Sequence, residues 1–214
     1  MLTPPKSANS SLTFFLMSDQ NDQIASYYES LIAEHGHHPR SCDYGRPESQ
    51  QTKFEVLSEI SDYSGKSILD VGCGFADFIP FLEGKFKGIS YHGVDITPSM
   101  AKAAAERHPD HRIECRDILS APPKQQYDLV TSNGIFYLAG ENARDFMHKM
   151  VTHMFSLATE AVAFNTLSTW ADFMNDKEFY ADPAETLEFC KSLTPKVTLR
   201  HDYMNHDFTV YLYK

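Results

Sequence analysis

Short apolar runs alternate with amphipathic stretches along most of the chain. The run Ser67–Val71 reads as a buried strand, and apolar residues at helical spacing follow it to about residue 86. The same alternation predicts further strands at residues 90–95, 112–117, 127–133 and 161–165, with helices at 98–106 and around 146–155. Strands that alternate with helices form a mostly parallel sheet with right-handed crossovers.

The C-terminal part of the chain departs from this alternation. Asp182-Pro-Ala-Glu185 is a strong helix start, because Asp can cap, Pro suits the first position and Glu follows three residues after the cap. That helix is predicted to end near Leu193. Residues 196–203 and 207–213 then read as two strands with a short connection around Asn205. A connection this short joins antiparallel strands, so the sheet is expected to contain one antiparallel strand.

Two helices are predicted before the first strand of the sheet. Residues 24–32 place apolar side chains on one helical face, Gly36 can end that helix, and a second helix spans about residues 48–61. Residues 1–18 are expected to be a flexible tail, with 1–16 an upstream extension before a start at Met17. The rest is expected to be a single domain, in which residues 19–62 form a helical lid and 63–214 the core.

Length and charge limit the classes of function. The 214 residues carry a formal net charge of −10, and 42% are hydrophobic, which is typical of one soluble globular domain. The negative charge disfavours nucleic-acid binding. No apolar run is long enough for a membrane span. Four widely spaced cysteines indicate reduced thiols and a cytoplasmic location.

Polar residues follow the predicted strands at the edge where parallel sheets bind ligands. Gly72-Cys73-Gly74 follows the first strand, and the glycines would let backbone approach a ligand. The other strand ends carry Asp95, Asp117, Asn133 and Asn165. The carboxylate of Asp95 could accept both hydroxyls of a ribose, and that of Asp117 an adenine amine. Their neighbours Ile96 and Ile118 could enclose the adenine ring, so this set favours a nucleoside ligand.

These motifs resemble those of the class I S-adenosylmethionine-dependent methyltransferases. Ile68-Leu-Asp-Val-Gly-Cys-Gly74 is similar to motif I of that family, and motifs II to IV correspond to 93–96, Asp117-Ile118 and 127–133. The resemblance covers about residues 50–214. One departure is Ala76, which stands where many members have a third glycine. Residues 180–183 and 199–203 resemble a bacterial subgroup of small-molecule type whose substrates are unknown.

The resemblance implies a fold and a cofactor site. The fold would be an α/β Rossmann-like sheet of seven strands, mostly parallel with the last strand antiparallel, with helices on both faces. The cofactor would be S-adenosyl-L-methionine, leaving S-adenosyl-L-homocysteine as product. Asp70 would organise the glycine turn, Asp95 would hold the ribose, and Asn133 would offer its carbonyl to the ammonium group. The full set of expected cofactor residues is Asp70, Gly72, Cys73, Gly74, Asp95, Ile96, Asp117, Ile118 and Asn133.

The acceptor and the catalytic residues are less constrained. Methyl transfer from a sulfonium is an in-line displacement, which needs a general base only if the nucleophile starts protonated. His201, Tyr137 and Asn165 are catalytic candidates, with Asp202 and His206 also near the expected site. The acceptor is expected to be a small molecule. No metal site is predicted, because the histidines of residues 35–38 lack a carboxylate or cysteine partner at ligand spacing.

Three alternatives stay open at this stage. An NAD-dependent oxidoreductase shares the glycine turn and the acidic residue that binds the ribose. The last glycine of its G-x-G-x-x-G motif, however, would fall at Asp77 here. A non-enzymatic nucleoside-binding module is the second alternative. The third is a methyltransferase that acts on a protein. The chain is expected to be a monomer or a homodimer.

Overall fold

The computed structural model describes residues 9–43, 46–138 and 140–214. Seven strands form one sheet in the order β3-β2-β1-β4-β5-β7-β6. The strands are β1 Ser67–Val71, β2 Ser90–Asp95, β3 Arg112–Cys115, β4 Tyr127–Ser132, β5 Ala158–Leu167, β6 Val197–Arg200 and β7 Asp207–Tyr213. The helices are α1 Asn9–His35, α2 Pro47–Ser58, α3 Phe78–Lys85, α4 Pro98–Arg107, α5 Ala143–Leu157 and α6 Pro183–Leu193, with short 3₁₀ turns η1 Pro39–Cys42 and η2 Gly140–Asn142.

The sheet has the predicted topology. β1 pairs in parallel with β2 and with β4, and β4 pairs in parallel with β5. β7 pairs antiparallel with both β5 and β6, so the antiparallel strand lies inside the sheet and β6 forms its edge. The Rossmann-like α/β class with an antiparallel last strand is confirmed.

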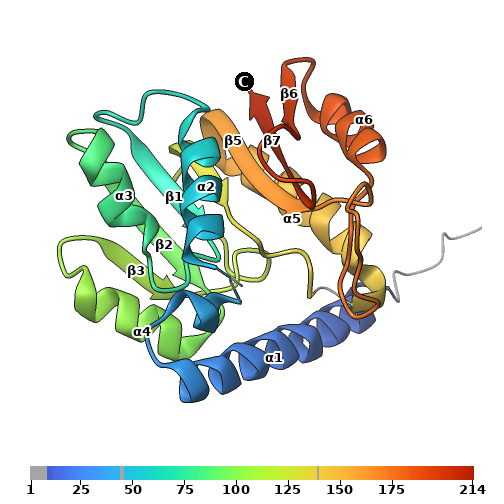
Figure 1. Cartoon of the computed structure of the whole chain (residues 1–214), viewed down its shortest axis with the longest axis horizontal. Helices are drawn as coiled ribbons and strands as arrows, with labels where there is room; N and C mark the ends of the chain where they lie inside the picture. The colour runs from blue at the N-terminus through green and yellow to red at the C-terminus, as the bar shows by residue number, and fades with distance from the viewer. Residues whose placement is uncertain (1–8, 44–45, 139) are drawn as a thin grey trace, which may run out of the picture.

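Apolar side chains cover both faces of the sheet. On one face Met150, Met154 and Cys190 come from α5 and α6, and on the other Leu57 and Leu82 come from α2 and α3. Figure 1 shows α2 and α3 in front of the sheet and α5 behind it. Because α2 packs on the core, it supports the sheet as well as bordering the ligand edge.

Some element ends differ from the sequence prediction. The third strand ends at Cys115 rather than 117, and the fifth is longer, at Ala158–Leu167. α1 begins at Asn9, so residues 9–18 of the predicted tail are helical, while residues 1–8 lie outside the described part of the chain. No proline or glycine stands between Asn9 and His35, so nothing in the sequence stops the helix earlier. In Figure 1, α1 runs along the bottom of the view, apart from both sheet faces.

The predicted start of the last helix is confirmed at atomic detail. The Asp182 side chain accepts hydrogen bonds from the backbone N–H groups of Ala184, at 2.8 Å, and Glu185, at 2.9 Å. Pro183 occupies the first helical position, where its missing N–H has no cost.

His92 makes the stability of the fold dependent on pH. This β2 side chain is 3% exposed, its Nδ1 contacts the Tyr127 hydroxyl, and its Nε2 lies 3.7 Å from a carboxylate oxygen of Glu114. Burial, with the nearby guanidinium of Arg112, lowers the pKa of His92 from 6.5 to about 4. The unfolded chain therefore binds more protons between these values, so the free energy of unfolding falls as pH drops from 6.5 towards 4.

We expect His92→Gln to remove this dependence. The difference in unfolding free energy between wild type and variant should shrink from pH 7.5 to pH 5, at no more than about 1.4 kcal/mol per pH unit. Urea denaturation at both pH values measures it. An equal difference at the two pH values would contradict the assignment.

Candidate active site

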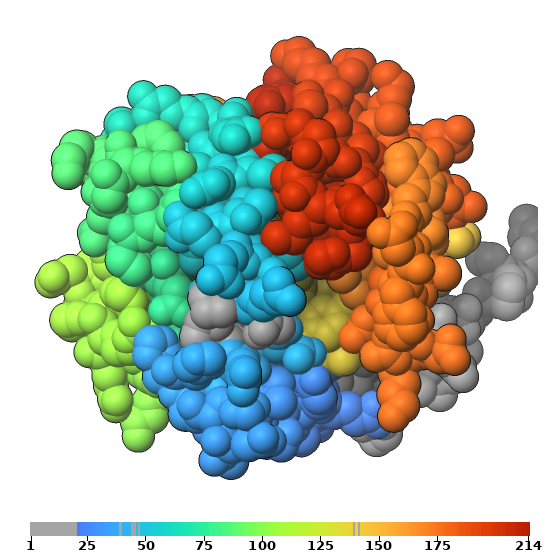
Figure 2. All heavy atoms as spheres, viewed as in Figure 1, coloured from blue at the N-terminus to red at the C-terminus, as the bar shows by residue number. Residues whose placement is uncertain are grey.

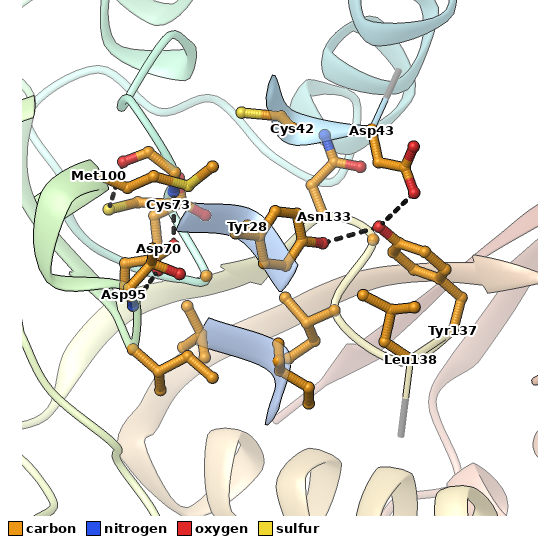
Figure 3. Close-up of a pocket in the computed structure, with 18 of the residues that line it drawn as sticks. Tyr28, Cys42, Asp43, Asp70, Cys73, Asp95, Met100, Asn133, Tyr137 and Leu138 are labelled. Atoms are coloured by element: carbon orange, nitrogen blue, oxygen red, sulfur yellow. Dashed lines mark hydrogen bonds between the residues drawn. The ribbon is translucent and has the colours of Figure 1, made fainter. Parts of the chain in front are cut away.

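A cavity of about 580 Å³ lies at the carboxyl ends of the parallel strands. Its lining contains every predicted cofactor-binding residue, namely Asp70, Gly72, Cys73, Gly74, Asp95, Ile96, Asp117, Ile118 and Asn133. Figure 3 shows Asp70, Cys73 and Asp95 on one side of the cavity, Tyr137 on the other, and Tyr28 and Asn133 between them. Figure 2 shows a hollow between α1 in blue, a red segment near the C-terminus and an orange segment after β5.

The glycine turn after β1 allows no side chain at its first position. Gly72 has φ +73°, and a Cβ there would lie 2.2 Å from Cγ2 of Ile135. Its N–H and that of Cys73 both donate to the carbonyl of Val94. Ala76, at the position of the missing third glycine, also has a positive φ, +57°. Its backbone thus adopts a conformation that glycine would reach without strain.

Asp95 ties the glycine turn to the end of β2. One carboxylate oxygen accepts from the N–H of Gly74 and the other from the N–H of Thr97, both at 2.8 Å. Burial raises the pKa of Asp95, and these hydrogen bonds oppose that shift. A carboxylate has about four lone-pair sites, so two stay available for a ligand diol.

Asp70 is a buried carboxylate whose hydrogen-bond partners in the described part of the chain are neutral hydroxyls. It is 4% exposed, and its oxygens accept from the hydroxyls of Tyr91 and Thr131. Burial raises the pKa of Asp70 from 3.8 to about 6, although the two hydroxyls favour the charged form. The stability that protonation confers is complete below pH 3.8 and is lost as pH rises through 6. At neutral pH the protein therefore holds a destabilising negative charge at the cavity wall.

Removing this charge should stabilise the fold but weaken cofactor binding. We expect Asp70→Asn to raise the free energy of unfolding at pH 8 by up to about 3 kcal/mol, with a smaller gain at pH 5. The affinity for cationic S-adenosylmethionine should fall about tenfold, because a charge-assisted interaction is lost. Denaturation and calorimetry at both pH values measure the two effects. If the gain in unfolding free energy of Asp70→Asn over wild type is smaller at pH 8 than at pH 5, this account is refuted.

Helix α1 reaches the expected adenine end of the cavity. The Asn21 amide donates to Asp117 at 3.1 Å, and Glu29 accepts from the N–H of Ser99 at 3.1 Å. The second oxygen of Asp117 accepts from the N–H of Leu119. Asn21 thus contacts the carboxylate that the sequence assigns to an adenine amine.

Three tyrosines and Asp43 form a hydrogen-bonded chain beside the cavity. The hydroxyls of Tyr27 and Tyr137 both donate to Asp43 at 2.9 Å, and Tyr28 and Tyr137 lie 2.8 Å apart at their oxygens. Figure 3 shows the part of this chain that Tyr28, Tyr137 and Asp43 form. Burial raises the pKa of Tyr28 and Tyr137 well above 10, and that of Tyr27 to about 12. These hydroxyls are therefore neutral.

Only some of the predicted catalytic candidates lie at the cavity. Tyr137 and His206 line the cavity, but His201 and Asn165 are not among its lining residues. His201 contacts the Ser168 hydroxyl at 2.7 Å and stacks on Phe208. Asp202, the other candidate, pairs with Arg200. Asn165 is fully buried behind the wall.

Sequence reasoning missed an ion pair in the cavity wall. Lys53 of α2 lies 2.9 Å from Asp207 of β7, and both side chains are nearly buried. His206 also contacts this carboxylate, at 3.4 Å. Charge alone gives no signal for such a pair, because the two residues lie far apart in the sequence.

The described ranges 9–43, 46–138 and 140–214 contain neither a metal-ligating cluster nor a membrane-spanning helix. In these ranges no group of three or more histidine, cysteine or acidic residues is arranged to hold a metal ion. His37, from the histidine cluster, instead contacts Asp77 at 3.3 Å, beside Arg107. No helix of the described residues is both long and apolar enough to cross a bilayer.

Comparison with known proteins identifies the family. Residues 69–155 match the model of a methyltransferase domain. A Mycobacterium tuberculosis protein described as a methyltransferase, Rv1506c, is 32% identical over 155 residues, covering 69% of this chain and 93% of that protein. Malonyl-[acyl-carrier protein] O-methyltransferase of Acetivibrio thermocellus is 35% identical over 92 residues, covering 41% of this chain and only 32% of the relative.

A solved structure shares the fold. Magnesium protoporphyrin IX methyltransferase from Synechocystis PCC 6803, with S-adenosylmethionine bound, has a TM-score of 0.66 at 14% identity, over 91% of this chain and 97% of that one. The chain belongs to the class I S-adenosylmethionine-dependent methyltransferases. It is an enzyme whose cofactor is S-adenosylmethionine, and the oxidoreductase and non-enzymatic alternatives are set aside.

The cavity fits this cofactor. At Gly72 the turn leaves no room for a Cβ, and at the neighbouring strand end Asp95 retains lone pairs for a diol. When bound, the cofactor supplies a methyl group that its positively charged sulfur has already activated.

Proposed function

We propose that this protein transfers the methyl group of S-adenosylmethionine to a small molecule held between the glycine turn and the tyrosine chain. The observation that carries the proposal is the extent of the cavity. It continues beyond the predicted cofactor residues to a second wall of Tyr28, Lys53, Tyr137 and His206. A nucleoside-methionine ligand does not need this wall, which leaves it for an acceptor.

The roles of the cofactor residues follow from their positions. Gly72 and Gly74 would let the backbone meet the methionine part, and Asp95 would hold the ribose hydroxyls. Asp117 would receive the adenine amine once Asn21 moves aside, with Ile96 and Ile118 beside the ring. Residues 19–62 would act as the lid of a single domain that spans 19–214.

The chemistry asks mainly for alignment. The acceptor atom must approach the methyl carbon opposite the sulfur, and water must be kept away. The described part of α1 borders the cavity through Ile24 and Tyr28, and its polar contacts to Asp117 and to the N–H of Ser99 hold it there. We assign to this helix the tasks of covering the reactants and positioning the acceptor.

Other properties support a small, soluble acceptor. The solved structure of similar fold is named for magnesium protoporphyrin IX, a small molecule, and one relative for malonyl-[acyl-carrier protein], a small acyl group on a carrier. A net charge of −10 disfavours nucleic acid. We place the enzyme in the cytoplasm, as a monomer or homodimer without nucleic-acid or membrane partners.

Transfer of label tests the proposal. The purified chain is incubated with methyl-labelled S-adenosylmethionine and, separately, with the small-molecule and protein fractions of a bacterial extract. We expect label to enter a compound of the small-molecule fraction. Label that appears in protein alone would favour the remaining alternative, a protein methyltransferase.

A further inference from the structure

Two asparagines fix each other's orientation at the end of β4. The backbone N–H of Gly134 donates to Oδ1 of Asn165 at 2.7 Å, and a backbone N–H can only be a donor. The other side-chain atom of Asn165 is then its nitrogen, which lies 2.7 Å from Asn133 and must donate to Oδ1 there. The remaining atom of Asn133 is therefore Nδ2, a donor of two hydrogens. The oxygen and nitrogen positions follow from the hydrogen-bond network without ambiguity.

That nitrogen has no partner in the part of the chain that the structure describes. Nδ2 of Asn133 is buried, yet no described group accepts its hydrogens. A buried donor left unpaired costs about 1–3 kcal/mol, so such groups in native proteins call for an explanation. Asn133 lines the cavity, and Figure 3 shows its side chain between the Asp70 side and the Tyr137 side. A bound ligand is the natural source of the missing acceptor.

The surrounding polar groups narrow the chemistry of that ligand. Asp70, Asp95 and Asp43 all offer acceptors. The tyrosine chain does the same, because Tyr137 gives its hydrogen to Asp43, and Tyr28 must then donate to Tyr137. These groups accept from a ligand, whereas Nδ2 of Asn133 must donate to one. The cations Lys53 and Arg116 also line the cavity, so this donor suits a ligand oxygen that carries negative charge.

We propose that the side chain of Asn133, oriented by Asn165, binds a carboxylate when the enzyme holds its ligands. This inference rests on the proposed function. This differs from the role that the resemblance implies for Asn133, in which its carbonyl would meet the ammonium group. Asn165 is a positioning residue, since it touches Asn133 and Gly134 but does not line the cavity.

The carboxylate has two possible sources with the same chemistry. One is the methionine end of the cofactor. The other is the acceptor, in which case a carboxylate oxygen would attack the methyl carbon directly. The oxygen–carbon bond would form, the carbon–sulfur bond would break, and its electron pair would stay on the now neutral sulfur. No proton moves in this step, so no general base is required.

Binding measurements separate the sources. Calorimetry on the full chain compares S-adenosylhomocysteine with 5′-methylthioadenosine, which lacks the amino-acid end. Benzoate and its neutral isostere benzamide are then titrated into protein saturated with S-adenosylhomocysteine. The variants are Asn133→Leu, which removes the donor, and Asn165→Asp, which keeps an acceptor for Gly134 but cannot donate to Asn133.

We expect both variants to lose about 10- to 100-fold in affinity for one carboxylate ligand only. A loss for S-adenosylhomocysteine but not for 5′-methylthioadenosine assigns the cofactor, and a loss for benzoate assigns the acceptor. Asn165→Asp should also invert Asn133, so that its oxygen faces the ligand. That variant should then prefer the cationic isostere benzamidine to benzoate, which mere loosening of the wall would not produce.

Two results would overturn the proposal. The first has two parts. In both variants the ratio of the affinities for S-adenosylhomocysteine and 5′-methylthioadenosine equals that of wild type, and benzoate either does not bind or binds as it does to wild type. The second is that benzoate and benzamide bind with equal affinity while the two variants keep the cofactor affinities of wild type. If wild type binds neither S-adenosylhomocysteine nor 5′-methylthioadenosine, the proposed function itself fails, so the two failures are distinguishable.

Discussion

Gly72→Ala is expected to abolish most cofactor binding and to destabilise the fold. The new methyl group would lie 2.2 Å from Cγ2 of Ile135, in a backbone with φ +73°. Left-handed strain of about 1–2 kcal/mol adds to overpacking of about 1–3 kcal/mol. We expect a total loss of about 2–5 kcal/mol in unfolding free energy, and a displaced turn that lowers affinity about 100-fold. Urea denaturation and calorimetry with S-adenosylhomocysteine measure the two losses.

Two controls isolate the close approach from the backbone strain. Gly65 has nearly the same φ, +72°, but a Cβ there would meet nothing within 4 Å. Gly65→Ala should therefore cost only the strain, with cofactor affinity unchanged. Adding Ile135→Ala to Gly72→Ala removes Cγ2 and leaves Cβ at 3.6 Å, which is ordinary contact. If this double variant binds no better than Gly72→Ala alone, steric exclusion at Gly72 is not the cause.

Asp95→Asn is expected to give the second largest effect. Each carboxylate oxygen of Asp95 accepts from a backbone N–H, so an amide nitrogen would face a donor on one side. The unpaired N–H should cost about 1–3 kcal/mol of stability. The loss of charge-assisted bonds to the ribose should lower cofactor affinity about 100-fold.

Changing the ligand checks the ribose assignment directly. Wild type should prefer 5′-methylthioadenosine to its 2′-deoxy analogue by about tenfold, the value of one hydrogen bond to a charged group. The Asp95→Asn variant should lose most of this preference. The same preference in variant and wild type would show that Asp95 does not meet the ribose.

Hydrophobic pattern and turn chemistry were sufficient to predict the framework of the site. β1 and its glycine turn, Asp95 after β2 and the cap at Asp182 depend on neighbours close in the sequence. The strand-end rule for parallel sheets then brings the predicted cofactor residues to one edge.

The other features of the site depend on contacts between residues that are far apart in the sequence. Tyr28 meets Tyr137 across 109 positions, and Asn133 meets Asn165 across 32. Neither pair has a local signal, since hydroxyl and amide side chains occur on many surfaces. The same limit explains His201, whose position at a strand junction suggested the site but whose ring packs on Phe208. Side-chain orientation is set by tertiary packing, which periodicity does not describe.

Binding of the methyl donor tests the central claim most directly. Calorimetry of the full chain with S-adenosylmethionine and S-adenosylhomocysteine should show saturable binding of one molecule per chain. Asp95→Asn should weaken it strongly, and Gly65→Ala should leave it unchanged. Absence of binding by both ligands, or tight binding of NAD in their place, would contradict the assignment of this cavity.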